Sequence, residues 1–119
     1  MRRAVLDSFA ATGRPGEHGD LASLAAQHVV VLDDHGRILM AHPFAAHRDG
    51  ARVNARGRTW WGNCAWDAFG IVAALELDDA TVTAQGVEVT FERGEPQPAD
   101  AVFHVLVPAR HWWDDIAFT

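Results

Sequence analysis

Residues Asn63–Leu75 read Asn-Cys-Ala-Trp-Asp-Ala-Phe-Gly-Ile-Val-Ala-Ala-Leu. We predict that this almost unbroken apolar stretch forms a helix. The strands expected elsewhere in the chain alternate apolar with polar residues, and this stretch does not. A helix that is apolar on all sides is a buried helix. It needs other elements to cover it, so the stretch predicts an α+β fold in which a sheet packs on one buried helix.

The segments around this helix read as strands of an antiparallel or mixed sheet. Alternating apolar and polar residues, bounded by Gly, Pro or Asp, predict strands after the helix. A further hairpin is expected before it, in a polar connection rich in arginine. The predicted strands are Arg52–Asn54, Thr59–Trp61, Ala80–Ala84, Val87–Glu92 and Ala101–Val107.

The N-terminal part predicts two short helices followed by a hairpin, an order that resembles a reduced winged helix. The second helix has no arginine or lysine, so we expect a structural module and not a DNA reader. The helices are predicted at Arg2–Thr12 and Leu21–His28, the latter capped by Asp20. The hairpin joins Val29–Leu32 and Arg37–Ala41 around Asp33–Gly36.

The 119 residues fit a single domain, which we divide into a winged-helix-like segment at 1–44 and a core at 45–119. The net charge of −6 disfavours nucleic-acid binding. No apolar run approaches the ~18 residues of a membrane span, and no apolar segment follows Arg2 and Arg3 to make a secretion signal. One free cysteine suits a reducing compartment. We therefore expect a cytoplasmic protein.

Cys64 and Asp67 are the candidate site residues. Their spacing of three places both side chains on one face of the predicted helix. Asn63 is expected to cap that helix, which would put Cys64 in the first turn. There the free backbone N–H groups and the helix dipole favour a thiolate.

Asp67 is the unusual residue of the stretch, because its predicted neighbours on the helix are apolar. Burial without a partner would raise the pKa of its carboxyl group and hold a proton there. A proton donor beside a reactive thiol indicates a functional site. The other reading also stands: free cysteines are commonly buried as small hydrophobic residues, and an aspartate suits the first helical turn through the dipole alone.

Residues 57–69 contain a glycine-arginine pair, an aromatic residue and then Cys-Ala-x-Asp, an order that resembles the core motif of alkylmercury lyases. Val31–Phe44, with its Asp-Gly-Arg turn region and His-Pro-Phe, is similar to the end of that family's winged-helix portion. The closing segment 112–119 is similar to the approach to the family's second cysteine. The resemblance runs from about Val29 to the end of the chain.

This resemblance implies protonolysis of a carbon–mercury bond, a reaction that needs no cofactor. Cys64 would be the attacking thiolate and would bind the mercury, which is a soft metal, and Asp67 would be the proton shuttle. The family's second cysteine lies just past the segment that ends here at Thr119. A second sulfur ligand would therefore come from an external thiol or from a homodimer. The expected partner is a small-molecule substrate.

Other residues leave alternatives open. The aromatic residues Trp60, Trp61, Trp66 and Phe69, with Trp112 and Trp113, could wall an apolar pocket beside Cys64 or simply form the core. The arginines from Arg48 to Arg58 could hold a carboxylate-bearing ligand or be a solvated loop. The histidines, His42 and His47 among them, show no metal-ligand spacing. Besides the enzyme, a non-catalytic module that binds a small ligand or soft metal is the second hypothesis.

Overall fold

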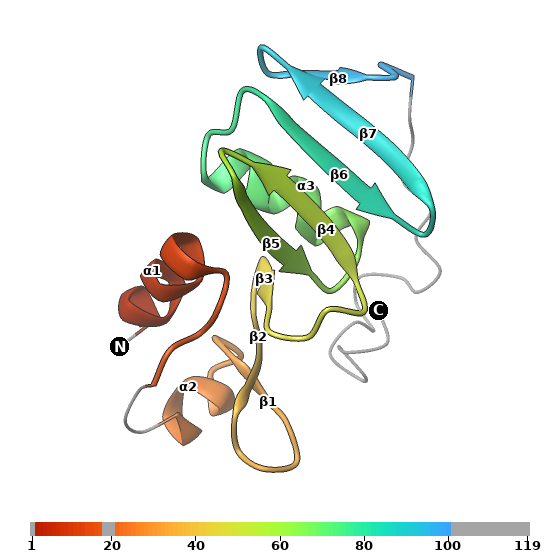
Figure 1. The fold of residues 1–119 in the computed structure, drawn as a ribbon. Coiled ribbons are helices and arrows are strands. Elements are labelled where there is room, and N and C mark those ends of the chain that lie inside the picture. The colour runs from red at the N-terminus through yellow and green to blue at the C-terminus, as the bar shows by residue number, and fades with distance from the viewer. Residues whose placement is uncertain (1, 18–20, 101–119) are drawn as a thin grey trace.

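Helices and antiparallel sheets alternate along the chain in the computed structural model, which describes residues 2–17 and 21–100 (Figure 1). The predicted α+β class is confirmed. A three-stranded sheet has the order β1-β2-β3, and a five-stranded sheet has the order β5-β4-β6-β7-β8. The elements are α1 (Arg2–Thr12), α2 (Ala22–Ala26), β1 (Val31–Leu32), β2 (Ile38–Ala41), β3 (Phe44–Ala45), β4 (Ala51–Ala55), β5 (Arg58–Gly62), α3 (Ala65–Ala74), β6 (Ala80–Ala84), β7 (Val87–Glu92) and β8 (Glu95–Gln97).

The N-terminal part has the predicted order of two helices and a hairpin, with the short strand β3 added to the hairpin. The helix α1 has the predicted bounds. The helix α2 is shorter than predicted, because Gln27 already leaves the helix and His28 takes a left-handed conformation with φ of 57°. The proposed cap Asp20 lies outside the described residues.

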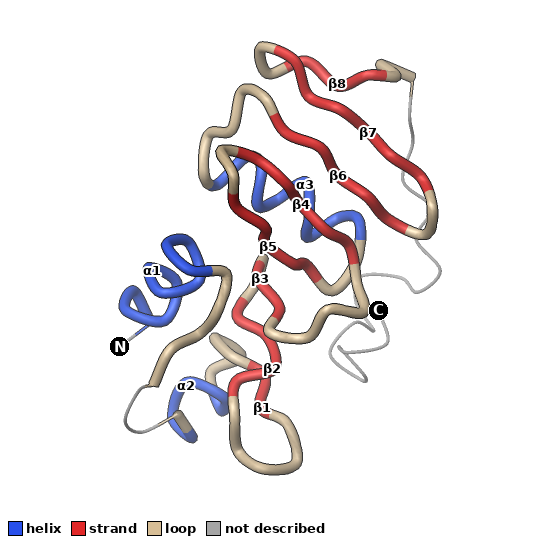
Figure 2. The backbone as a smooth tube through the Cα atoms, in the orientation of Figure 1, coloured by secondary structure: helices blue, strands red, loops and turns tan. Residues whose placement is uncertain are grey.

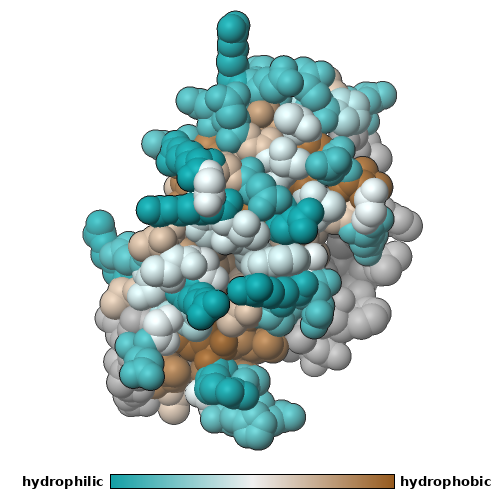
Figure 3. Space-filling view, in the orientation of Figure 1, coloured by the Kyte–Doolittle hydropathy of each residue, from teal (hydrophilic) through white to brown (hydrophobic). Residues whose placement is uncertain are grey.

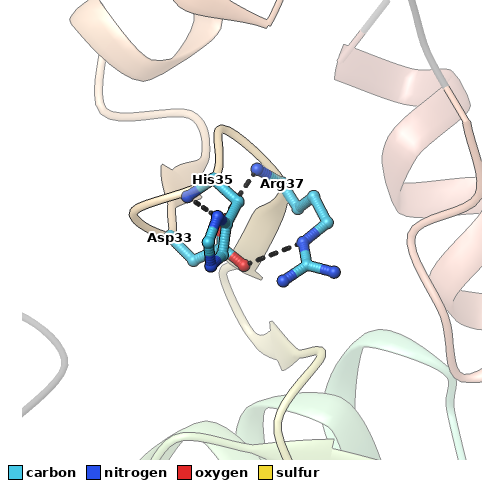
Figure 4. A network of polar contacts seen from close by, with 3 residues as sticks. All are labelled: Asp33, His35 and Arg37. Atoms are coloured by element: carbon cyan, nitrogen blue, oxygen red, sulfur yellow. Dashed lines mark hydrogen bonds and ion pairs between the residues drawn. The ribbon is translucent and has the colours of Figure 1, made fainter.

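The turn of the first hairpin lies where the sequence predicts it and is organised by Asp33. Its Oδ1 accepts hydrogen bonds from the backbone N–H groups of His35 and Arg37, at 2.8 and 2.9 Å (Figure 4). Its Oδ2 accepts a bond from Nε of Arg37 at 3.2 Å. Gly36 supplies the left-handed residue of the turn, with φ of 74°.

The five-stranded sheet has one buried and one open face. In the β4–β5 hairpin Val53 pairs with Trp60, and both side chains are buried on the inner face. The neighbouring pair Arg52 and Trp61 projects to the other face, because side chains alternate along a strand. Figure 3 views this open face and shows mainly hydrophilic and intermediate side chains over the sheet.

The helix α3 covers the inner face of the sheet, behind β4, β5 and β6 in Figures 1 and 2. Ala68 and Ile71 are fully buried there, so the predicted packing of the sheet on this helix is confirmed. The helix is not buried on all sides as predicted, because Trp66, Ala73 and Ala74 are exposed. The helix begins two residues later than predicted, and Leu75 is its C-cap. The edge strand β8 was not predicted, and the predicted strand Ala101–Val107 lies outside the described residues.

Side chains of the N-terminal part enter the same core as α3. Phe9 of α1 is fully buried and stacks on Phe44 of β3, with ring centroids 5.4 Å apart. Trp60 of β5 donates a hydrogen bond from Nε1 to the carbonyl oxygen of Ala10, at 3.0 Å. These contacts tie α1 to both sheets.

In the part of the chain that the structure describes, no helix has the length and apolar character needed to cross a membrane.

Candidate functional site

Cys64 is the N-cap of α3 and not a residue of its first turn. Its backbone is extended, with φ of −146° and ψ of 177°, and its side chain makes no capping hydrogen bond. The expectation that Asn63 caps the helix is wrong. The side-chain oxygen of Asn63 instead lies 3.0 Å from Nε2 of His47. The backbone N–H of Asp49 donates to Nδ1 of His47, so it is Nε2 that carries the proton toward Asn63.

Two glycines allow the start of α3 to lie tightly against the sheet. A Cβ on Gly62 would come within 2.9 Å of the Asp67 Cβ and of the Ala68 backbone nitrogen. A Cβ on Gly50 would meet the carbonyl oxygen of Gly62 at 2.1 Å. A residue larger than glycine is not tolerated at either position. The two glycines therefore allow the close approach that places Cys64 and Asp67 against β5.

Asp67 has a partner that the sequence did not reveal. It lies in the first turn of α3, its side chain is 16% exposed, and its Oδ1 is 2.9 Å from Nδ1 of His42. This hydrogen bond is the main reason that the pKa of His42 is raised above its ordinary value, while burial acts in the opposite direction. The expectation of a buried carboxyl group without a partner is therefore wrong.

His42 comes from a different element than Asp67, because it follows β2 directly. A carboxylate inside an apolar helix is costly unless it is paired. The sequence therefore indicates that Asp67 needs a partner, but it could not say which of the seven histidines or ten arginines would lie close to the carboxylate.

The thiol of Cys64 is half-buried, and burial raises its pKa above the ordinary value. The backbone N–H groups of Asp67 and Trp66 lower the pKa, whereas the charge and side-chain hydrogen bond of Asp67 raise it. The net direction is upward, so the prediction that the helix start favours a thiolate is wrong in its outcome. Burial and the adjacent carboxylate outweigh the amide groups, and the resting sulfur is protonated at neutral pH.

The aromatic residues that could wall a pocket beside Cys64 are placed in different surroundings. Trp60 is 3% exposed and belongs to the core, whereas Trp66 is 51% exposed. Phe69 packs edge-to-face on Phe91, with centroids 5.3 Å apart. Trp61 lines a cleft on the open face of the sheet. Trp112 and Trp113 lie outside the described residues.

Within residues 2–17 and 21–100, no group of three or more histidine, cysteine, aspartate or glutamate side chains could hold a metal ion. Of the histidines considered earlier, His42 pairs with Asp67 and His47 with Asn63. Both therefore support the start of α3 rather than gather around a metal.

Fold and site together define a class of small α+β protein in which a thiol and a carboxylate lie at the start of one helix packed on a sheet. The profile of the family described as MerB, alkylmercury lyase, matches residues 44–119, which is well over half of the chain. The chain therefore belongs to the alkylmercury lyase family, as the motif around Cys64 predicts. It matches no curated protein and no solved structure.

Proposed function

We propose that this protein cleaves carbon–mercury bonds, with Cys64 capturing the metal and Asp67 moving the proton. The observation that carries the proposal is the pair itself. The thiol and the carboxylate begin one helix, and the carboxylate is close enough to raise the pKa of the thiol. Both residues lie inside the region that the family matches.

The reaction can be written with the proton that Cys64 already carries. The sulfur donates an electron pair to the mercury of a substrate R–Hg–X, and its proton passes to the Asp67 carboxylate. The carboxyl group then gives that proton to the carbon as the carbon–mercury bond breaks, and the electron pair of that bond forms the new carbon–hydrogen bond. The products are the hydrocarbon R–H and a Cys64–mercury adduct, with no change of oxidation state.

An external thiol completes the cycle in this proposal. It takes the mercury from Cys64 and returns a proton to the sulfur, since thiolates are the preferred ligands of soft metals. Such thiols are abundant in a reducing cytoplasm, which is where we propose that the protein acts. The sequence contains a single cysteine, so this role fits an exogenous small molecule or a partner protomer.

His42 is the positioning residue of the pair. Its Nδ1 donates to Oδ1 of Asp67 at 2.9 Å, which fixes the carboxylate and leaves the second oxygen for proton transfer. His42 does not contact the thiol in any described interaction. We expect His42→Ala to lower turnover about tenfold, equal to roughly 1.4 kcal/mol, and His42→Gln, which keeps an N–H donor, to lower it less.

A turnover assay tests the proposal. The purified protein is incubated with a phenylmercury salt and excess small thiol in D₂O, and the released benzene is measured by mass spectrometry. We expect benzene with one deuterium, because the proton comes from an exchangeable group. Cys64→Ser should abolish release, and Asp67→Asn should lower it by about 10²–10⁴-fold, the usual cost of losing a proton-transfer group.

The other outcomes decide against the lyase. Mercury retained in a 1:1 ratio on the wild-type protein, with no benzene, would support the non-catalytic soft-metal binding module. Full activity in Asp67→Asn would refute the proton role of the carboxylate. The pKa of His42, followed by NMR, should fall in Asp67→Asn, because the hydrogen bond that raises it is weakened; an unchanged pKa would contradict the positioning role.

A further inference from the structure

A second site is suggested by a cleft on the open face of the five-stranded sheet. The cleft has a volume of about 670 Å³ and is lined by residues from three separate parts of the chain. These are the segment after α1, the loop between β3 and β4, and the strands β4 and β5 themselves. Cys64 and Asp67 do not line it, and neither does His42.

The floor and one wall of the cleft are fixed by contacts. On the floor, the hydroxyl group of Thr59 donates to Oδ1 of Asn54 at 2.8 Å, across the β4–β5 hairpin. At the wall, Gly13 approaches the strand so closely that a Cβ there would lie 2.7 Å from the carbonyl oxygen of Thr59. Gly13 also has φ of 73°. The turn after α1 is thus seated on β5 and holds the next residue, Arg14, at the cleft.

The cleft is basic in a chain that is acidic overall. Its lining includes Arg14, Arg48 and Arg52 and contains no aspartate or glutamate, although the net charge of the chain is −6. Among the described residues, the arginine–carboxylate pairs are Arg3 with Asp7 and Arg37 with Asp33. The three arginines of the cleft therefore have no acidic partner in the described part of the chain.

The remaining polar and aromatic groups suit the same kind of ligand. The guanidinium group of Arg52 lies over the ring of Trp61, 6.0 Å from the centroid, a distance at the outer limit of a cation–π contact. The planar, five-donor guanidinium group of an arginine suits bidentate binding of an oxyanion. Trp61, which is partly buried and lines the cleft, adds an apolar surface beside the charge.

We propose that this cleft binds a small organic oxyanion, a carboxylate or a phosphate ester, held by Arg14, Arg48 and Arg52 with its apolar part against Trp61. Two of these arginines belong to the group singled out in the sequence, whereas Arg56 and Arg58 of that group line a different, smaller cavity. The third arginine comes from the turn after α1, outside the family-matched region. The proposal is independent of any reaction at Cys64.

Calorimetric titration of the full chain tests the proposal, with benzoate, phenyl phosphate and inorganic phosphate as probes. We expect Arg48→Gln and Arg52→Gln each to weaken binding by about tenfold, because each removes a charge-assisted hydrogen bond. Arg58→Gln is the matched control: it removes the same charge from β5 without touching the cleft, and should leave the affinity within about twofold. Circular dichroism confirms that each variant is folded.

The three probes separate the sources of the anion. Benzoate binding more tightly than both phosphates assigns a carboxylate ligand, and the reverse order assigns a phosphate ester; inorganic phosphate binding as well as phenyl phosphate would remove the role of Trp61. Absence of binding by all three probes at millimolar concentration would overturn the proposal. So would equal weakening by Arg58→Gln and Arg52→Gln, which would indicate attraction by overall charge alone. Cys64→Ser should bind the probes as the wild type does.

Discussion

Asp67 shows how one residue can satisfy stability and chemistry together. As an acidic residue in the first turn of α3, it lies where the helix dipole favours negative charge. His42 supplies the hydrogen-bond partner that its low exposure requires. These two contributions would suffice for a purely structural aspartate. What they do not explain is the thiol beside it, because a carboxylate next to a half-buried cysteine opposes ionisation of the thiol.

The titration of Cys64 can therefore be altered through Asp67. Burial is the largest cause of its raised pKa, and the charge and side-chain hydrogen bond of Asp67 act in the same direction. Asp67→Asn removes the charge and keeps the backbone N–H groups that lower the pKa. We expect the pH midpoint of alkylation by iodoacetamide to move down in Asp67→Asn, while the wild-type midpoint lies above the ~8.5 of a free cysteine.

The sign of this shift is informative. A thiol with a raised pKa reacts more slowly at pH 7 and gains reactivity as the pH rises through that pKa. A wild-type midpoint below that of a free cysteine would mean that the N–H groups at the helix start, and not burial, determine the direction of the shift in the thiol pKa. His42→Gln serves as the control that alters the neighbour of Asp67 and leaves the carboxylate charge in place.

At the scale of elements, α3 begins with a residue that caps a helix poorly. Cys64 as the N-cap and Asp67 three residues later occupy the positions of a capping box, in which serine or threonine is the usual first residue. Sulfur is a weak acceptor, and the thiol makes no capping hydrogen bond. The helix thus gives up part of the stabilisation that a hydroxyl group would supply.

Substitutions at the cap measure that loss. We expect Cys64→Ser to be more stable than Cys64→Ala by about 1 kcal/mol, because a serine oxygen can accept the N–H of Asp67. Urea unfolding followed by circular dichroism measures the difference. Cys64→Ser is also expected to equal or exceed the wild type in stability while losing all reaction with the organomercurial. Equal stability of the serine and alanine variants would show that α3 is not capped by this side chain.

The sequence predicted elements well where the pattern is local. The bounds of α1, β6 and β7 agree with the prediction, because their periodicity and flanking turns are contained in the segments themselves. The short strands β3 and β8 were missed. They have two and three residues, too few to show alternation, and form by pairing with β2 and β7.

The site was predictable to the same degree. The sequence singles out Cys64 and Asp67 because they are three residues apart and the family motif includes them, and their catalytic role stays a prediction. The partner His42 was not found, because its contact depends on how the turn between β2 and β3 is placed beside α3. For the same reason the sequence could not show that Arg48 lines the cleft while Arg58 lines a different cavity, or that Arg14 also lies at the cleft. The direction in which the pKa of Cys64 shifts depends on how deeply the thiol is buried, and a sequence motif does not contain that information.

At the scale of the molecule, the family match begins at residue 44, yet the core extends well before it. Val5 and Phe9 of α1 are fully buried and belong to one cluster with Ile71 of α3. The hydrogen bond from Trp60 to Ala10 joins the same parts. The segment 1–44 thus contributes side chains to the core that positions the site, which supports our proposal that residues 1–119 form one domain.

Removing Phe9 tests whether the two parts fold together. Phe9→Ala takes a fully buried ring away from Phe44 and should cost about 3–5 kcal/mol, a large share of the ~5–15 kcal/mol that stabilise a typical domain. If 1–119 is one domain, urea unfolding of this variant remains a single transition, with the same lowered midpoint by tryptophan fluorescence and by circular dichroism. Val87→Ala, at a side chain that is 62% exposed, is the control and should change stability by no more than about 0.5 kcal/mol. Two separate transitions, with only the first shifted by Phe9→Ala, would show instead that the N-terminal part unfolds on its own and that the core around Cys64 does not depend on it.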